Sequence, residues 1–313
     1  MTILVLGATG FIGRALVARL VRDGHHVIAW VRDLERARAA LGADVELVAA
    51  DGGEPVLGAA VARAGGVVNL AGEPILEQRW SDQRRAVLRA SRVGVTEMLA
   101  RVIAAASPRP DVLVQGSAIG IYGDRGDEEL VEDAAAGAGF LAELCRDWEA
   151  AAQPAATAGA RVVLLRTGIV LGRGGGALAK MVPVFRAGVG GAVGGGRQWQ
   201  SWIHLDDHVG LVVVALGDPR WRGAVNATAP EPVTGRALAK ALGHALHRPS
   251  FMPVPGFALK LLYGKAAQVM LESQRVLPRA ALGFGYRFGF TTLPAALADI
   301  LGRPPAAEAS PPA

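Results

Sequence analysis

The stretch GATGFIG (residues 7–13) decides the fold expected for this chain. It follows the apolar, strand-like ILVLG (3–7) and leads into a segment whose apolar residues recur at helical spacing. In such a turn Gly7 permits a tight reversal, Gly10 lets a pyrophosphate approach the main chain, and Gly13 lets helix and strand pack closely. The sequence therefore predicts a dinucleotide site at the first strand–helix turn.

Further strands alternate with helical segments along the first half of the chain. The strand-like runs are HVIAWVR (26–32), VELVAAD (45–51), GVVNLAG (66–72), DVLVQGS (111–117) and ARVVLLRTG (160–168). These runs are apolar on both faces, which indicates a parallel sheet covered by helices on each side. We therefore expect an α/β fold with a Rossmann-like, doubly wound parallel sheet. A long helix over residues 81–106 is expected to begin at a Ser cap.

The chain changes character after the last of these strands, where glycine-rich, aromatic and then proline-punctuated segments follow. We expect residues 1–170 to form the dinucleotide-binding domain, with its sheet completed by a strand near 223–228. Residues 171–302 are expected to form mainly a smaller C-terminal substrate lobe. The tail, 303–313, is expected to be disordered.

Composition excludes several classes of protein. With 51% hydrophobic and 19% charged residues, the chain can bury a large core and is not globally disordered. Its single cysteine, Cys145, rules out an internal disulfide and a multi-cysteine metal site, and no histidine pair has metal-ligand spacing beside a carboxylate. We expect no metal. The formal net charge is +5, but the arginines are scattered, which argues against a nucleic-acid partner.

The apolar runs are too short to cross a membrane. Arg or Gly interrupts each run before the roughly 18–20 residues that a span needs. Strand-like sequence already begins at residue 3, where a secretory signal would carry its charged and apolar regions. We therefore expect a cytoplasmic protein with no membrane partner.

The end of the second strand indicates which dinucleotide is bound. An NAD site carries an Asp or Glu there for the ribose 2′-hydroxyl. Here the strand ends Trp30-Val31-Arg32, and a guanidinium can bind a 2′-phosphate through two hydrogen bonds. The sequence favours NADP(H) over NAD. The alternative, in a chain so rich in arginine, is that Arg32 is a solvated loop residue.

Several segments together resemble a known family. They are GATGFIG (7–13), VVNLAGEPI (67–75), Ser91-Arg92, SAIGIYG (117–123), Trp148-Glu149, VLGRGGGALAKM (170–181), GRQWQSWIHLDD (196–207), ESQRVLPRAALGFGYRF (272–288) and LPAALADIL (293–301). The chain resembles the extended short-chain dehydrogenase/reductases, and more narrowly the branch of epimerase family proteins related to nucleotide-sugar epimerases. The resemblance covers residues 1–302. GxxGxxG alone is widespread, whereas QWxSWIH and SxRVxPxxL are far more specific.

The resemblance implies further coenzyme contacts. Leu70, Ala71 and Gly72 end the fourth strand and, with Glu73 after them, are expected beside the adenosine ribose and the diphosphate. Arg92 on the long helix is expected to face the dinucleotide. The glycine-loop residues that complete the expected NADP(H) site are Thr9, Phe11 and Ile12.

The proton-transfer pair of this superfamily is missing. The resemblance implies a Tyr and, four residues later, a Lys, but counting back from Glu149 places Leu141 and Cys145 at these positions. Ser117 matches the Ser that polarises the substrate oxygen. Tyr122, just past the fifth strand, is the best remaining acid/base candidate, and a packing role is the alternative.

The second lobe offers polar groups for a substrate. Lys180 follows a glycine loop and suits an anionic group. Trp199 and Trp202 can stack on a sugar or base, with core packing as the alternative. His204 can carry a proton near neutral pH, although a structural, backbone-bonded histidine is the commoner case.

These features give two functional expectations. The leading one is an NADP(H)-dependent epimerase or oxidoreductase that moves a hydride to or from a nucleotide-linked or other polar, sugar-like substrate. The alternative is a regulator or scaffold that kept NADP(H) binding and lost catalysis. The replaced Tyr–Lys pair favours the alternative, whereas Ser117, Lys180 and the elaborate second lobe favour the enzyme. The expected partner is a small-molecule substrate such as a nucleotide sugar, and the chain is expected to be a monomer or a homodimer.

Overall fold

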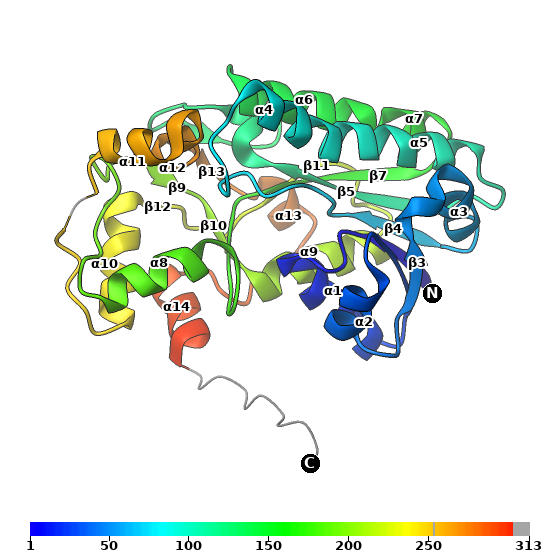
Figure 1. Ribbon diagram of the computed structural model, residues 1–313, viewed down its shortest axis with the longest axis horizontal. Coiled ribbons are helices and arrows are strands. Elements are labelled where there is room, and N and C mark those ends of the chain that lie inside the picture. Colours follow the sequence, from blue (N-terminus) through cyan, green and yellow to red (C-terminus); the bar gives the residue numbers. More distant parts are fainter. Residues whose placement is uncertain (253, 303–313) are drawn as a thin grey trace, which may run out of the picture.

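Seven parallel strands form one sheet at the centre of the molecule (Figure 1). The computed structural model describes residues 1–252 and 254–302. In spatial order the strands are β11 (Gly223–Ala227), β7 (Arg161–Thr167), β5 (Val112–Ala118), β4 (Gly66–Asn69), β1 (Thr2–Leu6), β2 (His26–Val31) and β3 (Glu46–Ala49). The expected Rossmann-like, doubly wound fold is confirmed. The chain runs from β1 outward to β3 and then returns to β4, so ligands are expected where β1 and β4 end side by side.

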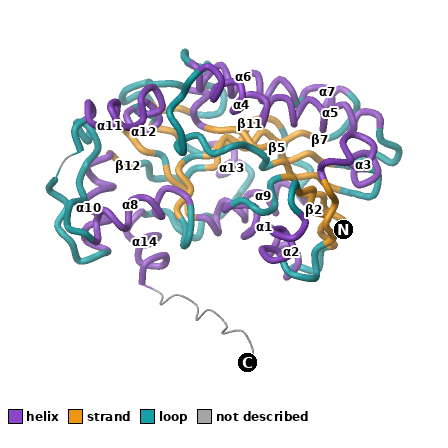
Figure 2. Tube along the Cα trace, viewed as in Figure 1, coloured by secondary structure: helices purple, strands orange, loops and turns teal. Residues whose placement is uncertain are grey.

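Helices cover both faces of this sheet (Figure 2). One face packs on α1 (Phe11–Arg22), α2 (Leu34–Leu41) and α9 (Leu205–Gly217). The other face packs on α3 (Gly53–Val61), which follows the short η1 (Ala50–Gly52), and on α5 (Val95–Ala105) and α7 (Gln153–Thr157). Because both faces are buried, the strands read as continuous apolar runs.

The long helix expected after the fourth strand is interrupted. α4 (Asp82–Arg89) is joined to α5 by a π-helical turn, Ala90–Gly94. Such turns often occur at functional sites. This one contains Ser91 and Arg92, and both side chains bond to the main chain of the turn that follows β4.

Most of the segments after β7, apart from α9 and β11, build a smaller lobe, at the left of Figure 1. Its core packs α8 (Gly176–Arg186), α10 (Gly235–Ala245) and α14 (Leu293–Gly302) around β8 (Ile169–Leu171) and β10 (Trp202–His204). The other elements here are β9 (Trp199–Gln200), β12 (Val233–Thr234), α11 (Gly256–Tyr263), η4 (Gly264–Ala267), α12 (Gln268–Leu271) and β13 (Arg275–Val276). The short α13 (Arg279–Gly283) packs instead on the core of the sheet. The tail expected at 303–313 lies outside the described residues.

Several contacts join this lobe to the segments around the sheet. β13 pairs with β6 (Glu129–Leu130), which follows β5 and the short η3 (Ile119–Tyr122). Ala266 and Tyr263 pack in one apolar cluster with Trp80, Leu88 and side chains of α6 (Phe140–Ala151). The lobe therefore lies against the segments that follow β4 and β5.

Candidate functional site

The turn after β1 is packed against main chain. Gly7 has φ +77°, and a Cβ on it would lie 2.6 Å from the carbonyl carbon and oxygen of Leu70. A Cβ on Gly13 would lie 2.1 Å from the Gly7 carbonyl oxygen. Any side chain at either position would push α1 or the end of β4 away. Glycine is needed here because two main-chain turns meet at the end of the sheet.

Gly10 stands at the N-terminus of α1 and faces outward. Its N–H donates to the Gly7 carbonyl at 3.0 Å, and both Thr9 and Gly10 are exposed. The first N–H groups of a helix lack helical partners and give that end a partial positive charge. This end of α1 can therefore accept an anionic group such as a pyrophosphate.

Phe11 connects this turn to the smaller lobe. A Cβ on Gly172, Gly175 or Gly176 would lie 2.9, 2.2 or 2.9 Å from atoms of the Phe11 ring. The loop before α8 thus wraps closely around the ring, and Ile12 packs on the same core as Phe11. Packing on Phe11 accounts for three of the four glycines in GRGGG (172–176).

Arg32 extends from the end of β2 into solvent. Its side chain is 86% exposed, and Nη1 lies 3.2 Å from Glu73 Oε1. Glu73 Oε2 also lies 3.6 Å from Arg84 Nη1. Asp33 turns away, because its carboxylate accepts the Arg36 N–H at 2.9 Å and caps α2. The structure therefore places a solvated guanidinium, with no competing Asp33 carboxylate, beside the turn that follows β4.

Arg92 holds the main chain of that turn. Its Nη2 donates to the Glu73 carbonyl at 3.0 Å, and its guanidinium lies over the Trp148 ring, 5.3 Å from the centroid. A Cβ on Gly72 would lie 3.0 Å from Arg92 Cζ. Ser91 Oγ accepts the Glu73 N–H at 3.2 Å. Arg92 is buried, which lowers its pKa, and it shapes the turn from Ala71 to Glu73 from behind.

A buried polar network supports the same turn, and the sequence analysis missed it. Asn69, the last residue of β4, donates through Nδ2 to Thr96 Oγ1 and Gln115 Oε1, both at 3.0 Å. Its Oδ1 accepts the Ala71 N–H at 3.1 Å, and Trp148 Nε1 donates to Thr96 Oγ1 at 3.0 Å. The available signal was a polar residue that closes an apolar, buried strand.

The positions expected for the Tyr–Lys pair lie on α6 and are closed to solvent. Leu141 is 8% exposed and Cys145 is 3% exposed. Both side chains pack over Gly120, where a Cβ would lie 3.4 Å from Leu141 Cβ and 3.8 Å from Cys145 Sγ. Burial raises the pKa of Cys145 to about 12, so the thiol stays neutral near pH 7. Neither side chain can serve as the missing acid/base.

Ser117 faces α6 rather than an open cleft. Its Oγ donates to Glu149 Oε1 at 2.6 Å. Arg166, which pairs in register with Ser117 on β7, binds both oxygens of that carboxylate, at 2.8 and 2.9 Å. Since a hydroxyl has one proton, Ser117 has none left to donate to a substrate oxygen. The geometry argues against the catalytic role expected for Ser117.

Tyr122 lies in the same network and is fully buried. Its hydroxyl donates to Asn226 Oδ1 at 2.7 Å and accepts from Arg166 Nη1 at 3.0 Å. Burial raises the pKa of the phenol. The packing alternative given for Tyr122 fits these contacts, and an acid/base role does not, because no substrate can reach the hydroxyl.

Lys180 and Trp199 remain accessible in the smaller lobe. Lys180 is exposed on α8, with Nζ 3.4 Å from the Leu76 carbonyl oxygen. Trp199 is partly buried, donates through Nε1 to Asp127 Oδ1 at 2.7 Å and lies under the Arg275 guanidinium. One face of Trp199 is thus already stacked on a cation. The Lys180 ammonium group therefore lies between α8 and the segment that follows β4.

Trp202 and His204 are core residues, contrary to the substrate-binding roles expected for them. Trp202 is 1% exposed and donates through Nε1 to the Glu231 carbonyl at 2.9 Å. His204 Nδ1 accepts the Asp206 N–H at 3.1 Å and so caps α9. Its ring stacks on Phe290 with centroids 3.9 Å apart, and burial lowers its pKa. The backbone-bonded alternative describes His204.

Glu272 and Asp124 bring two carboxylates together where the lobe meets the segment after η3. Asp124 Oδ1 accepts the Ser273 N–H at 3.0 Å, and Gln274 Nε2 donates to the Gly123 carbonyl at 3.2 Å. Burial, with a smaller contribution from the Asp124 charge, raises the pKa of Glu272 to about 7. A carboxyl group with this pKa can both give and take a proton near neutral pH.

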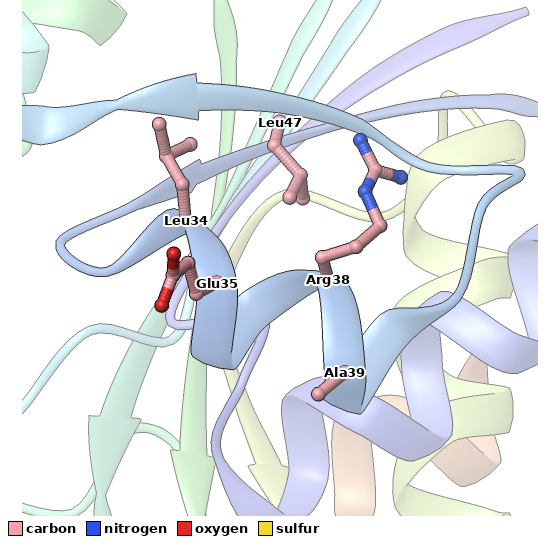
Figure 3. A pocket seen from close by; sticks show the side chains of 5 residues that line it. All are labelled: Leu34, Glu35, Arg38, Ala39 and Leu47. Carbon is pink, nitrogen blue, oxygen red and sulfur yellow. The ribbon is translucent and has the colours of Figure 1, made fainter.

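A hollow elsewhere on the surface belongs to a different part of the fold. It lies between α2 and β3 and is lined by Leu34, Glu35, Arg38, Ala39 and Leu47 (Figure 3). Arg38 crosses one side of it to donate to the carbonyls of Gly42 and Val45 at 2.8 and 2.9 Å. None of the residues expected to bind coenzyme or substrate lines this hollow, and Arg38 serves there to fasten the loop between α2 and β3.

Comparison with known proteins places this architecture in a family. Residues 3–227 match the NAD dependent epimerase/dehydratase family. The chain belongs to this family. Residues 254–300, in the smaller lobe, match a domain of unknown function, DUF1731. The resemblance to epimerase family proteins expected from the sequence is confirmed.

Relatives within this epimerase family align along nearly the whole chain. The chloroplastic SDR39U1 homolog of Arabidopsis thaliana is 43% identical, over 96% of this chain and 87% of that protein. Epimerase family protein Mb2239 of Mycobacterium bovis is 39% identical, over 96% and 97%. The crystal structure of human epimerase family protein SDR39U1 (isoform 2) with NADPH has a TM-score of 0.88 and 35% identity, over 96% of this chain and 99% of that chain.

Solved structures of lower sequence identity share the fold alone. The UDP-glucuronic acid 4-epimerase of Bacillus cereus, solved with UDP-glucuronic acid and NAD, has a TM-score of 0.78 at 17% identity. At this identity a common backbone does not transfer a substrate. In this chain the site contains a closed polar network of Ser117, Tyr122, Glu149, Arg166 and Asn226, and the last three were not predicted from the sequence as site residues.

Proposed function

We propose that this epimerase-family protein binds NADP(H) along the carboxyl ends of β1, β2 and β4. The diphosphate lies at the N-terminus of α1, with Gly7, Thr9, Gly10 and Ile12 around it. The ribose of the adenosine half lies against Leu70, Ala71 and Gly72. The close packing of Gly7 and Gly13 supports this arrangement, and so does NADPH in the structure of the 35% identical human relative.

Arg32 binds the 2′-phosphate in this proposal. The solvated guanidinium exchanges its contact with Glu73 for the phosphate, which offers more acceptor oxygens and more charge. We expect Arg32→Ala to weaken NADPH binding tenfold or more and to leave NADH binding unchanged, as followed by nicotinamide fluorescence. Arg22→Ala, at the far end of α1, is the control for loss of a surface arginine. Equal losses for both coenzymes would show that Arg32 does not bind the 2′-phosphate.

We further propose that the protein binds the coenzyme as a sensor and does not catalyse hydride transfer with a Tyr–Lys pair. Leu141 and Cys145 carry this proposal, because a hydride acceptor or donor needs a partner for its hydroxyl proton and these buried side chains cannot provide one. The protein then acts as an NADP(H)-responsive binding protein, whose state differs between reduced and oxidised coenzyme.

The test combines binding with turnover. We expect NADPH and NADP⁺ to bind with different affinities and to protect the turn after β4 from hydrogen exchange to different extents. We also expect no hydride transfer from 4-deuterated NADPH to UDP-linked keto sugars or simple sugar aldehydes. Deuterium in any recovered sugar would contradict the sensing role. It would not contradict the proposed coenzyme site.

Glu272 favours a second candidate, an NADP(H)-dependent oxidoreductase or epimerase with a different proton donor. Its carboxyl group has a pKa raised to about 7, and the next residue, Ser273, accepts the Trp199 N–H through Oγ at 2.9 Å, so we place a polar, sugar-like substrate beside this segment. In this case Glu272→Gln abolishes any deuterium transfer, whereas the exposed Glu77→Gln does not. Transfer that survives Glu272→Gln would exclude this carboxyl group as the donor.

A further inference from the structure

The smaller lobe carries a set of large apolar side chains in contact with solvent. Among the described residues the four most exposed large apolar side chains are Phe251 at 77%, Phe257 at 74%, Leu261 at 71% and Leu262 at 65%. Met252, at 48%, lies beside the first of them. We call these five residues the apolar face. Soluble monomers seldom expose such a cluster unless it binds something.

The apolar face belongs to one end of the molecule. Phe257 and Leu261 are four residues apart and so share a side of α11, while Phe251 and Met252 lie on the segment that leads from α10 to α11. That segment and α11 form the left end of the molecule in Figure 1. Arg79, from the turn after β4, donates through Nε to the Leu262 carbonyl at 2.9 Å and holds the C-terminal end of α11. The helix is therefore fixed with its apolar side outward.

The part of the chain that contains the apolar face, residues 232–271, also carries the net positive charge. Residues 232–271 contain five Lys and Arg residues and no Asp or Glu. They account for the whole formal net charge of +5, so the rest of the chain is balanced. Lys260 lies on α11 between Phe257 and Leu261 in sequence, Lys265 follows the helix, and both are exposed. Apolar and cationic groups are thus mixed on one surface.

The mixture of apolar and cationic side chains on this surface indicates which kind of partner it binds. A second copy of the chain would bring two such positive surfaces together, which is unfavourable. A nucleic acid would be held by the Lys and Arg side chains and would leave Phe251, Phe257 and Leu261 in water. An anionic lipid surface satisfies both features, since apolar side chains enter the acyl boundary while lysines reach the headgroup charges.

We propose that the apolar face, with Lys260 and Lys265, docks the protein on the surface of a bilayer that contains anionic lipid. None of the described helices has the length and hydropathy needed to cross a membrane, so the contact is with one leaflet. The docking departs from the expectation, drawn from the lack of a spanning segment, that the protein has no membrane partner. It does not depend on the coenzyme or on catalysis.

The test uses the full chain and vesicles of phosphatidylglycerol and phosphatidylcholine. We expect the protein to co-sediment with mixed vesicles and not with pure phosphatidylcholine, and added salt to release it. Phe257→Ser with Leu261→Ser should lower partitioning tenfold or more, because two large apolar groups no longer enter the lipid. Lys260→Glu with Lys265→Glu should lower it by a similar factor.

Matched variants distinguish this from nonspecific binding. Leu34→Ser with Leu282→Ser removes two other exposed leucines outside the face and should leave partitioning unchanged. NADPH binding, measured in parallel, shows that each variant is folded. Failure to bind anionic vesicles would overturn the proposal, and so would equal binding by the Phe257→Ser, Leu261→Ser variant. A dimer in solution that this variant dissociates, without vesicle binding, would assign the face to a second copy instead.

Discussion

Ser117 and Glu149 are joined by a hydrogen bond of 2.6 Å from Oγ to Oε1, although 32 positions separate them in the chain. The carboxylate is held in turn by both Nε and Nη2 of Arg166. This relationship turns a serine in a catalytic motif into part of the packing between β5, β7 and α6.

Loss of the Glu149 charge should destabilise the protein. Glu149→Gln leaves the Arg166 guanidinium, with its side chain 11% exposed, without its counter-charge. Breaking such a pair by changing one partner typically costs about 3–5 kcal/mol of unfolding free energy. Urea denaturation measures the loss. Glu143→Gln, at an exposed position of the same helix, is the control and should change the unfolding free energy by less than about 0.5 kcal/mol.

Removal of the Tyr122 hydroxyl should affect stability rather than coenzyme binding. Tyr122→Phe leaves Asn226 Oδ1 without its donor and costs about 1–3 kcal/mol of unfolding free energy. The dissociation constant for NADPH should change less than twofold. If the variant kept its stability but its turnover fell about 10²-fold, the result would support an acid/base role for Tyr122.

Cys145 should be inert in the folded protein. Burial raises the pKa of its thiol to about 12, well above the ordinary value for cysteine, so the thiolate is scarce even at pH 8. We expect a disulfide reagent such as Ellman's reagent to leave the native protein unmodified and to titrate one thiol after denaturation. Fast reaction of the native protein would mean that α6 opens and that this position reaches solvent.

The contact between Phe11 and the glycine loop should transmit changes from the smaller lobe to the coenzyme site. In Gly175→Ala the new methyl group would lie 2.2 Å from a ring atom of Phe11, so the ring or the N-terminus of α1 must move. We expect NADPH affinity to fall at least tenfold, as measured by fluorescence titration. Gly195→Ala, where no heavy atom lies within 4 Å, should leave the affinity unchanged.

Glu272 should make stability depend on pH between its unfolded and folded pKa values. Its pKa is raised from 4.5 to about 7, so the folded state binds the proton more tightly than the unfolded state. Stability from this group is therefore present below pH 4.5 and falls as the pH rises through 7. Glu272→Gln should gain about 1–2 kcal/mol over the parent at pH 8 and little at pH 4. A constant difference across this range would place Glu272 in solvent.

The sequence by itself determined the coenzyme side of this protein. The glycine spacing of residues 7–13 is a local signal, because the tight turn, the open Gly10 and the packing of Gly13 on Gly7 all lie within this stretch of seven residues. The strands could also be predicted from the sequence, since a sheet buried on both faces requires continuous apolar runs. Even the absence of an acid at Arg32 could be read from position alone.

Tertiary structure alone decided the remainder of the site. Whether Ser117, Tyr122, Trp202 and His204 face a substrate or the core depends on which residues of other elements meet them. Arg166, Glu149 and Asn226 come from β7, α6 and β11, and no local pattern records that they converge on β5 and η3. Hydrogen bonds between distant elements form only when the whole sheet is assembled, so the sequence could name the motif but not the direction of its side chains.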